Sequence, residues 1–474
     1  MPQWGGDNAM KEMRILSPTA ILGYGFPEAS WEAGLARDPH VIAVDAGSTD
    51  PGPYYLGSGL SFTDRQAVKR DLALMIPAAL ERGLPVIVGT SGGSGADTHL
   101  SWTVEIVKEI AKEQSLTFKL ATISAEISHQ TVLENLKAGR VQPLKPAPPL
   151  TPEMVDQSTS IVAQMGVEPF IAALNQGAQV ILAGRAYDPA VFACLAIKEG
   201  FDPGPAIHLG KILECAAIAA TPGSGSDCMF GTLRDDHFLV EPLSPNRRCT
   251  TLSVAAHTLY EKSNPLILPG PGGVLDLNQT TFTQATENSV MVKGTRFIPI
   301  PGGQKYTVKL EGAHRVGYRT VSFAGVPDPI MIEQIGVITE AVKERVQSNF
   351  KHLDPKTFFL DFKIYGAGAV LGMFKDLPAP KTTAPELGVV IEAVAPTQDQ
   401  ANTICGFARS TMLHFGYEGR KSTAGNLAFP FSPSDFKAGA VYEFSLYHLM
   451  EVDDPASCFP VVMHECRQGE CHEI

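Results

Sequence analysis

Short apolar runs alternate with longer amphipathic runs through the first 220 residues of the chain. The apolar runs predict strands at Arg14–Leu22, His40–Val44, Pro85–Val88, Phe118–Ile123, Gln179–Ala183 and Ala206–Leu209. The amphipathic runs predict helices at Glu28–Arg37, Asp64–Arg82, Thr98–Gln114, His129–Ala138, Thr151–Asn175 and Ala190–Lys198. This alternation is typical of an α/β fold in which a parallel sheet is wrapped by helices. An open doubly wound sheet fits better than the alternative of a closed barrel, and either places a ligand at the carboxyl ends of the strands.

The pattern changes twice further along the chain. A Pro-rich connection covers residues 141–152, and turn residues dominate from 221 to 318. After 318 the predicted elements are strand, helix, strand, strand, helix and strand, which is the order of a ferredoxin-like α+β domain. The predicted elements are Tyr318–Ala324, Pro329–Phe350, Thr357–Tyr365, Leu387–Val394, Gln398–His414 and Ala440–Val452. The predicted organisation is a flexible extension (1–13), an α/β domain (14–220), a β-rich connection (221–318), a ferredoxin-like domain (319–455) and a tail (456–474).

Composition narrows the class of partner. The 474 residues carry a formal net charge of −12 and no basic stripe, which disfavours nucleic acids and anionic membranes. No apolar run is long enough to span a bilayer, and the first residues lack a signal-peptide pattern, so we expect a cytoplasmic protein. The eight cysteines are scattered, which favours reduced thiols. Cys466, Cys471 and nearby histidines near the end form either a metal-type cluster or part of an unstructured tail.

A polar loop follows the second predicted strand. It contains Asp45, Asp50 and Tyr54 among glycines and prolines, which suits an active-site loop on a rigid strand. The alternative is a structural turn in which the aspartates bind backbone donors.

A glycine-rich loop follows the third predicted strand and leads into a helix. Successive glycines allow backbone N–H groups to converge on an anion, although no P-loop lysine is present. The candidate binding residues are Ser91, Gly92, Gly93, Ser94 and Asp97. His99 is a candidate base or ligand, and the alternative is a structural histidine with Asp97 as a helix cap.

Arg185 and Asp188 follow the fifth predicted strand and should face the same cleft. Arg185 could grip a carboxylate through two hydrogen bonds, or it could pair with Asp188 to close a turn. Gly23 and Gly25, with Asp45 downstream, partly match a dinucleotide fingerprint, but Glu28 stands where a glycine is required.

Weaker candidates lie elsewhere in the chain. They are Glu126, His208, Cys228 as a nucleophile, and cations beside glycines at Arg248, His257, Lys309–Arg315 and Gly419–Asn426. Solvated surface charge is the alternative explanation for these later cations.

Long strings in one order resemble the AtuA-like family, named for acyclic terpene utilisation. They include AILGYGFPEASWEAGL, VDAGSTDPGPYYLGSG, GTSGGSGAD, LAGRAYDPAVFA, YTVKLEGAHRVGYRT and TAGNLAFPFSPSD, and they run from about residue 14 to 455. The family is similar to proteins found with catabolic genes for branched acyl and carboxylic compounds. The resemblance implies a catabolic role, and members often accompany a small partner domain.

Three functions are compatible with these features. The first is a lyase, either a hydratase or dehydratase or a carbon–carbon lyase, acting on a small carboxylate or its CoA thioester. In that reading Asp45 or Asp50 is the base, His99 is the acid and Arg185 clamps the substrate, without a redox cofactor. Acids near His99 could alternatively hold Mg²⁺. The second is an NAD(P)-dependent oxidoreductase, and the third is a non-catalytic subunit that needs a small partner protein. A homo-oligomer is expected for a metabolic protein of this kind.

Overall fold

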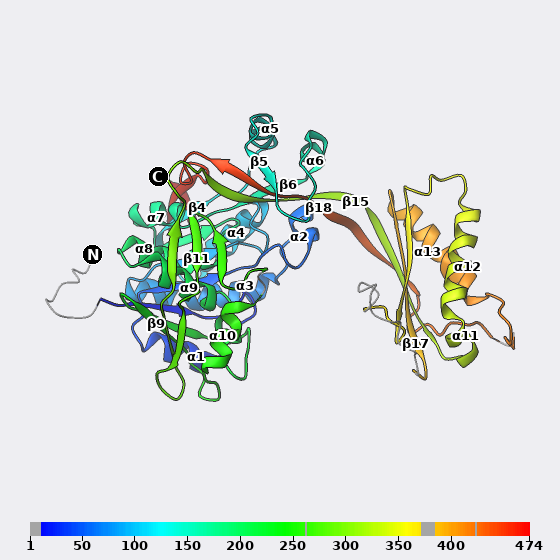
Figure 1. Ribbon diagram of the computed structural model, residues 1–474, viewed down its shortest axis with the longest axis horizontal. Helices are drawn as coiled ribbons and strands as arrows, with labels where there is room; N and C mark the ends of the chain where they lie inside the picture. The colour runs from blue at the N-terminus through cyan, green and yellow to red at the C-terminus, as the bar shows by residue number, and fades with distance from the viewer. Residues whose placement is uncertain (1–10, 261–262, 371–383, 422–423) are drawn as a thin grey trace. The chain divides into compact units, whose positions relative to one another are not determined.

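The computed structural model describes residues 11–260, 263–370, 384–421 and 424–474 (Figure 1). Within the chain, two compact units separate. The first consists of Met1–His314 with Phe444–Ile474, and the second consists of Arg315–Glu443. We describe each unit by itself.

Five parallel strands form the centre of the large sheet in the first unit. Their order is β1-β2-β3-β7-β4, and every neighbouring pair is parallel. Their bounds are β1 Met13–Ser17, β2 Val41–Asp45, β3 Val86–Gly89, β4 Thr117–Ile123 and β7 Val180–Ala183. The sheet is therefore a mixed α/β sheet with a parallel centre, as the alternating pattern predicted.

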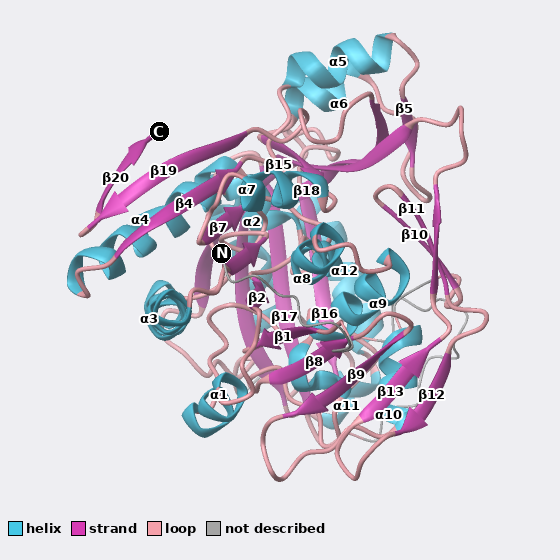
Figure 2. Ribbon diagram, turned by 90° about the vertical axis from the view of Figure 1, so that its left-hand side faces the viewer, coloured by secondary structure: helices cyan, strands magenta, loops and turns pink. Residues whose placement is uncertain are grey.

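Helices cover both faces of this centre, which explains why its strands are almost continuously apolar. Ile42 and Val44 point to one side, against α1, α3 and α4, whereas Val41 and Ala43 point to the other, against α7, α8 and α9 (Figure 2). The helix bounds are α1 Glu28–Leu35, α3 Arg65–Arg82, α4 Asp97–Glu113, α7 Glu168–Asn175, α8 Asp188–Lys198 and α9 Pro203–Leu213.

Antiparallel strands extend the sheet at both edges. Beside β1 lie β8 Met229–Leu233, β9 His237–Pro242, β13 Val290–Lys293 and β12 Thr281–Gln284, in that order. Beside β4 lie β19 Val461–Arg467 and then β20 Glu470–Glu473. The region 221–318 was predicted as a connection and 456–474 as a tail, but both supply strands to the main sheet.

The sequence misassigned two further segments of this unit. The helix predicted over 151–175 is α6 Pro152–Gln157, β6 Ser160–Gln164 and α7. The strand predicted at 206–209 lies inside α9, because a short apolar run does not distinguish a strand from a fully buried helix. The remaining elements are α2 Pro53–Ser58, α5 His129–Lys137, β5 Val141–Pro143, a 3₁₀ turn Ala216–Ala219, α10 Thr251–Leu259, β10 Ile267–Gly270, β11 Gly273–Asp276 and β14 Arg296–Pro299.

The second unit is built on a sheet in the order β16-β17-β15-β18. Along the chain its elements are β15 Tyr306–Val326, α11 Pro329–Glu333, α12 Ile335–Asn349, β16 Phe359–Tyr365, β17 Leu387–Ala395, α13 Gln398–Leu413 and β18 Asp435–Val452. β15 and β18 begin or end in the first unit, where β6 pairs with residues 309–313 of β15. A ferredoxin-like classification of the second unit stays a prediction.

Candidate functional site

Loops from three neighbouring strands meet at the carboxyl edge of the parallel centre. The backbone N–H of Ala46, after β2, donates to the carbonyl of Gly89 at the end of β3. The N–H of Thr90 donates to the carbonyl of Gly184, after β7, and the N–H of Arg185 donates to that of Gly95. Backbone hydrogen bonds therefore bring the three polar motifs of the sequence together at the sheet edge where α/β proteins bind ligands.

Glycine is required where these loops approach most closely. A Cβ on Gly47 would lie 2.6 Å from the Cα of Gly93, and one on Gly95 would overlap the backbone nitrogen of Arg185. Gly95 also has a φ of +69°, in the left-handed region that favours glycine. These glycines fix the packing of the loops that carry the polar side chains.

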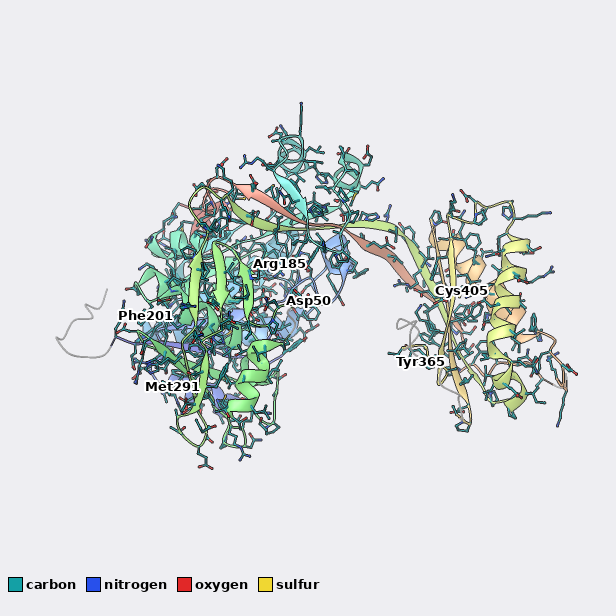
Figure 3. The ribbon with its side chains drawn as sticks, viewed as in Figure 1. Asp50, Arg185, Phe201, Met291, Tyr365 and Cys405 are labelled. Atoms are coloured by element: carbon teal, nitrogen blue, oxygen red, sulfur yellow. A yellow bond between two sulfur atoms is a disulfide. The ribbon has the colours of Figure 1, made fainter. Side chains whose placement is uncertain are left out.

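Arg185 lies at the centre of the site and is only 3% exposed (Figure 3). Its Nε donates to Oε2 of Glu311 at 2.7 Å, and its Nη1 donates to Oδ1 of Asp188 at 3.0 Å. Nη1 also donates to the carbonyl of Ala186. Because protein acceptors already bind Nε and Nη1, this geometry supports a structural role for Arg185 more than a substrate clamp.

Glu311 belongs to the segment Lys309–Arg315, for which the sequence left solvated surface charge as the alternative explanation. It is buried on β15, and its Oε1 accepts hydrogen bonds from Lys309 at 2.6 Å and from Thr49 at 3.0 Å. Burial alone would raise the pKa of Glu311, but Arg185 and Lys309 outweigh burial and lower it to about 2. Glu311 is therefore ionised and neutralises the buried guanidinium.

Asp45 differs from Glu311 because no ion pair like those of Glu311 with Arg185 and Lys309 is found for it among the described residues. The side chain is buried, and no hydrogen-bond partner for Oδ1 is found among the described residues. Burial raises the pKa of Asp45 well above its usual value, and the neighbouring Asp188 and Glu214 raise it further, against the opposing effect of Arg185. Asp45 therefore holds its proton at higher pH than an ordinary aspartate.

Asp188 is the second carboxyl group of the pair. Burial raises the pKa of Asp188 above its usual value, because the opposing effects of Arg185 and Lys309 only partly offset it and the nearby Asp50 raises it further. Asp188 accepts a hydrogen bond from Arg185, whereas Oδ1 of Asp45 lacks any such donor in the described part of the chain. Both carboxyl groups therefore have raised pKa values, and the larger shift is at Asp45, so Asp45 keeps its proton to higher pH than Asp188 does. Two carboxyl groups whose pKa values are separated in this way can act as an acid and a base.

The glycine-rich loop contributes two buried hydroxyl groups. The side chains of Ser91 and Ser94 are buried, and neither hydroxyl has a hydrogen-bond partner in the residues that the structure describes. Gly92 and Gly93 have φ values of +65° and +100°, so they turn the loop sharply. Two buried donors without acceptors suit a polar ligand atom better than a packed core.

The start of α4 is already occupied by protein carboxylates. The N–H of Asp97 donates to Glu126 at 3.0 Å, and the hydroxyl of Ser124 donates to Asp97 at 2.6 Å. A protein carboxylate therefore takes the position that an anionic ligand would use at this helix N-terminus. The hydroxyl groups of Ser91 and Ser94 remain as the donors of this loop.

His99 is buried beneath the glycine-rich loop. Its Nδ1 accepts from the N–H of Ala96 at 3.3 Å, and its Nε2 lies 3.0 Å from the carbonyl of Leu60. Burial lowers the pKa of His99, so the ring is neutral. Both nitrogens bind the backbone, which favours a role in positioning the loop over a role as an acid.

Asp50 and Tyr54 lie on the more exposed side of the site. Asp50 is exposed, and Tyr54 on α2 is 37% exposed with its ring against Tyr55. Figure 3 labels Asp50 and Arg185 in the same unit. These exposures suit contact with an incoming ligand more than a buried base.

The polar region extends to the end of α9, where the sequence indicated little. Glu214 lies close enough to raise the pKa of Asp45, Tyr187 and Cys215. Lys211 is buried, with its Nζ 4.6 Å from the ring centroid of Tyr260. A lysine and a glutamate three residues apart, at the end of a mostly apolar helix, were the available signal in the sequence.

Several weaker candidates have structural roles. The N–H groups of Gly23 and Gly25 both donate to Oδ2 of Asp71, at 2.9 and 3.1 Å, so a carboxylate occupies the turn that resembled a dinucleotide fingerprint. Burial raises the pKa of the Cys228 thiol well above its usual value, which disfavours the nucleophile reading. His208 is buried between Thr295 and Thr258.

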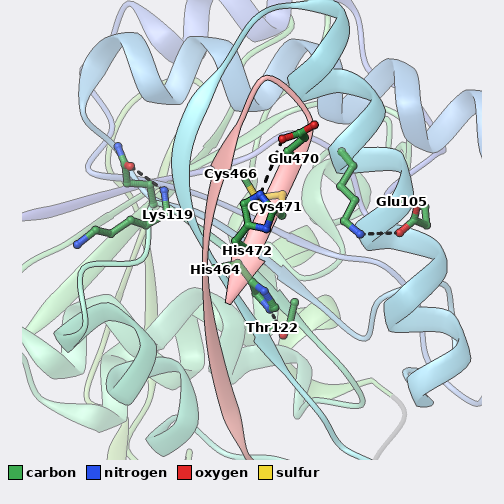
Figure 4. The surroundings of a disulfide bond; sticks show 10 residues. Glu105, Lys119, Thr122, His464, Cys466, Glu470, Cys471 and His472 are labelled. Carbon is green, nitrogen blue, oxygen red and sulfur yellow. Dashed lines mark hydrogen bonds and ion pairs between the residues drawn. A yellow bond between two sulfur atoms is a disulfide. The ribbon is translucent and has the colours of Figure 1, made fainter. Parts of the chain in front are cut away.

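The segment predicted as a tail is a hairpin closed by a disulfide between Cys466 and Cys471 (Figure 4). This pair departs from the expectation of reduced thiols, whereas the other six cysteines are free. Nε2 of His464 lies 3.1 Å from the hydroxyl of Thr122. Within the described residues, no group of three or more His, Cys, Asp or Glu side chains could hold a metal ion, in this hairpin or near His99. No described helix is long and apolar enough to cross a membrane.

The fold and site define an α/β protein with a paired-carboxyl site at the carboxyl edge of a doubly covered sheet. The family model described as "Acyclic terpene utilisation family protein AtuA" matches residues 64–228 and 237–433, so the chain belongs to this family. The match includes Arg185, Asp188 and Glu311, whereas Asp45 precedes it. Comparison with curated proteins finds no match, and comparison with solved structures finds none.

Proposed function

We propose that the protein is a lyase of acyclic terpene utilisation, in which Asp45 and Asp188 act as an acid and base pair. The observation that carries the proposal is the buried Asp45 carboxyl group, which has a raised pKa and lies beside the arginine-bound Asp188. Family membership supports the metabolic context. The arrangement requires no redox cofactor.

Hydration of a carbon–carbon double bond conjugated to a carbonyl group illustrates the chemistry. Asp188 takes a proton from water, the water oxygen bonds to the β-carbon, and the π electrons move to the α-carbon. Asp45 then gives its proton to the α-carbon, so atoms and charge balance. Dehydration is the same sequence in reverse.

Local charge favours one of the two substrate classes expected from the sequence. With Asp45 protonated, the carboxylates of Asp50, Asp188 and Glu311 still outnumber the cations Arg185 and Lys309 among these described groups of the site. A free carboxylate would therefore meet like charge, whereas the neutral carbonyl of a CoA thioester would not. The hydroxyl groups of Ser91 and Ser94 could donate hydrogen bonds to that carbonyl.

The test compares Asp45→Asn and Asp188→Asn with Asp235→Asn, which changes an exposed aspartate in a turn far along the chain. The assay follows hydration of a branched α,β-unsaturated acyl-CoA by loss of absorbance. We expect each site variant to lose roughly 100-fold or more in kcat, because each removes one proton-transfer group, and the control to keep it. Turnover by Asp45→Asn close to that of the control would overturn the assignment.

Two other functions remain as alternatives. The carboxylate of Asp71 in the glycine turn disfavours an NAD(P)-dependent oxidoreductase, and calorimetry with NAD and NADP tests that reading. A non-catalytic subunit would bind an acyl-CoA without turning it over, or would turn it over only with a small partner protein.

We also propose that the second unit is ferredoxin-like, since its strands and helices follow the order expected of that arrangement.

A further inference from the structure

A buried histidine on α10 has a ring nitrogen that the described protein leaves unbound. His257 is only 7% exposed, so solvated surface charge does not explain it. No hydrogen-bond partner for its Nε2 is found among the described residues. Buried polar atoms in native proteins are almost always paired, so this nitrogen indicates a binding partner that is not part of the described chain.

Neighbouring side chains hold the ring of His257 in place. It stacks on the ring of Tyr260, with centroids 4.6 Å apart and an angle of 27° between the planes. The hydroxyl group of Tyr260 lies 3.1 Å from Sγ of Cys215, and Nζ of Lys211 lies 4.6 Å from its ring centroid. A ring packed in this way presents Nε2 in one direction, as a binding residue must.

These neighbours connect His257 with the paired-carboxyl site through the end of α9. A Cβ on Gly210 would overlap the carbonyl oxygen of Pro189, so α9 lies directly against the residue that follows Asp188. Burial raises the pKa of the Cys215 thiol to about 12, and Asp188 is among the charges near enough to raise it further. Cys215 therefore lies between Asp188 and the Tyr260 ring on which His257 stacks.

The end of α9 also lies at the sheet edge that carries Asp45. The hydroxyl group of Ser17, the last residue of β1, donates to the carbonyl of Leu213 at 2.7 Å. β1 is the neighbour of β2, whose last residue is Asp45. A continuous polar region therefore runs from the carboxyl pair along the end of α9 to His257.

The far end of this polar region suits a neutral oxygen atom. Burial lowers the pKa of His257 to about 4, and the nearby Lys211 lowers it further, so the ring is neutral. A neutral imidazole nitrogen exchanges a hydrogen bond with a hydroxyl or keto oxygen. Lys211 and Glu214 have opposite charges at the end of α9, so neither sign is in excess for an additional charged group.

We propose that His257 binds a second oxygen atom of the substrate, on the part of the carbon chain that extends from the reacting thioester towards α10. This inference rests on the proposed function, in which Ser91 and Ser94 bind the thioester carbonyl. The substrate is then an acyl compound with a hydroxyl or keto group beyond the reacting carbons. A chain without that group would leave Nε2 of His257 buried and unpaired, which is how a polar site rejects an analogue.

Two other roles fit His257 less well. A purely structural histidine binds protein through its ring, as His208 does with Thr295 at 2.7 Å and Thr258 at 3.0 Å. A general acid must be protonated near neutral pH, and a ring with a pKa of about 4 is not. His257 is therefore a specificity-determining residue rather than a proton-transfer group.

Calorimetry of the full-length protein with saturated acyl-CoA thioesters tests the proposal without relying on turnover. The probes are pairs of equal chain length, one plain and one with a hydroxyl group, moved one carbon at a time from the γ-carbon outwards. We expect the wild type to bind one hydroxylated chain about 10-fold more tightly than its plain counterpart. His257→Phe keeps an aromatic ring but has no nitrogen, so it should bind both equally.

Two further variants separate hydrogen bonding from packing. The amide of His257→Gln reaches a similar position, so this variant should regain part of the preference for the hydroxylated chain. His352→Phe is the matched control, because His352 is exposed in the second unit, and it should keep the full preference. A wild type that prefers no hydroxylated chain, or a preference that His257→Phe retains, would overturn the proposal.

The same experiment distinguishes this proposal from the lyase assignment. A hydroxyl preference that depends on His257, in a protein that does not hydrate any acyl-CoA, would support the binding role and overturn only the lyase. Failure to bind any acyl-CoA would overturn both.

Nitrogen NMR of histidine-labelled protein provides a direct signature. The Nε2 resonance of His257, identified by its absence from the His257→Gln spectrum, should shift when the preferred hydroxylated thioester is added. The plain thioester should leave it in place. A shift with both thioesters, or with neither, would contradict a hydrogen bond from His257 to the second oxygen.

Discussion

Asp45 destabilises the folded protein whenever its buried carboxyl group is ionised. Its pKa is raised in the folded state, so its contribution to stability is fully present below the unfolded pKa of about 3.9 and is lost as pH rises through the folded value. Asp45→Asn removes the ionisation. We therefore predict that, in urea unfolding, the variant gains stability relative to the wild type between pH 4 and pH 8, by about 1.4 kcal/mol for each unit of pKa shift.

The control for this prediction is Asp235→Asn, which changes an exposed aspartate. Its difference from the wild type should not change with pH. If the difference between Asp45→Asn and the wild type were equally constant, the raised pKa of Asp45 would be contradicted. Together with the kinetic test, the experiment separates the ionisation of Asp45 from its role in turnover.

The Arg185–Glu311 ion pair should be costly to break from either side. Arg185 is 3% exposed and Glu311 is 1% exposed, so either group left alone would be a buried charge with reduced compensation. We predict that Arg185→Met or Glu311→Gln lowers the free energy of unfolding by about 3–5 kcal/mol, and that the double variant costs less than the sum.

The matched control is Lys108→Met, which breaks an exposed pair with Glu105 and should cost less than about 1 kcal/mol. Strictly additive effects of Arg185→Met and Glu311→Gln would show that the two side chains do not stabilise each other. Glu311 has a pKa lowered to about 2, so its contribution is present above the unfolded pKa of about 4.3 and should disappear as pH falls towards 2.

The sequence located some of these residues but not their pairing. Asp45, Arg185 and Asp188 follow apolar runs, and a parallel sheet places such positions at one edge. Glu311 is 126 residues from Arg185 in the chain, and no local pattern indicates that they meet. The roles of the candidate site residues stay predictions until the variants are measured.

At the scale of elements, the glycine-rich loop depends on close backbone packing. Gly95 and Gly83 have nearly the same φ, +69° and +68°, but a Cβ on Gly95 would overlap the backbone of Arg185, whereas one on Gly83 would meet nothing within 4 Å. We predict that Gly83→Ala costs about 1 kcal/mol and that Gly95→Ala costs at least about 2 kcal/mol more, measured by urea unfolding. Equal losses would indicate that the loop can move aside.

Helices and strands were predictable from the sequence where the spacing of apolar residues matched the faces that the fold buries. The strands β2 and β3 are short apolar runs between clear helices, and both faces are covered, so their pattern is unambiguous. The segment 151–175 failed because β6 is short and apolar and lies between two helices. Its identity as a strand depends on pairing with residues 309–313 of β15, which the local sequence does not encode.

At the scale of the molecule, the sequence indicated two parts but not the extent of the main sheet. The strands β8, β9, β12 and β13 come from the region predicted as a connection, and β19 and β20 come from the predicted tail. Each joins the sheet through antiparallel pairing with a strand distant in the chain or with its own neighbour. Short antiparallel strands of this kind have weak local signals, because pairing with their partner strands decides their position.

Separate cores should allow the two units to unfold separately. Ile391 is buried in the core of the second unit, whereas Ile181 is buried in the core of the first. We predict that Ile391→Ala, which removes about 2–5 kcal/mol of packing, speeds hydrogen exchange in β17 and leaves exchange in β3 unchanged. Ile181→Ala should do the reverse in the same full-length chain. Exchange that rises in β3 and β17 together in either variant would mean that the two units unfold as one cooperative body.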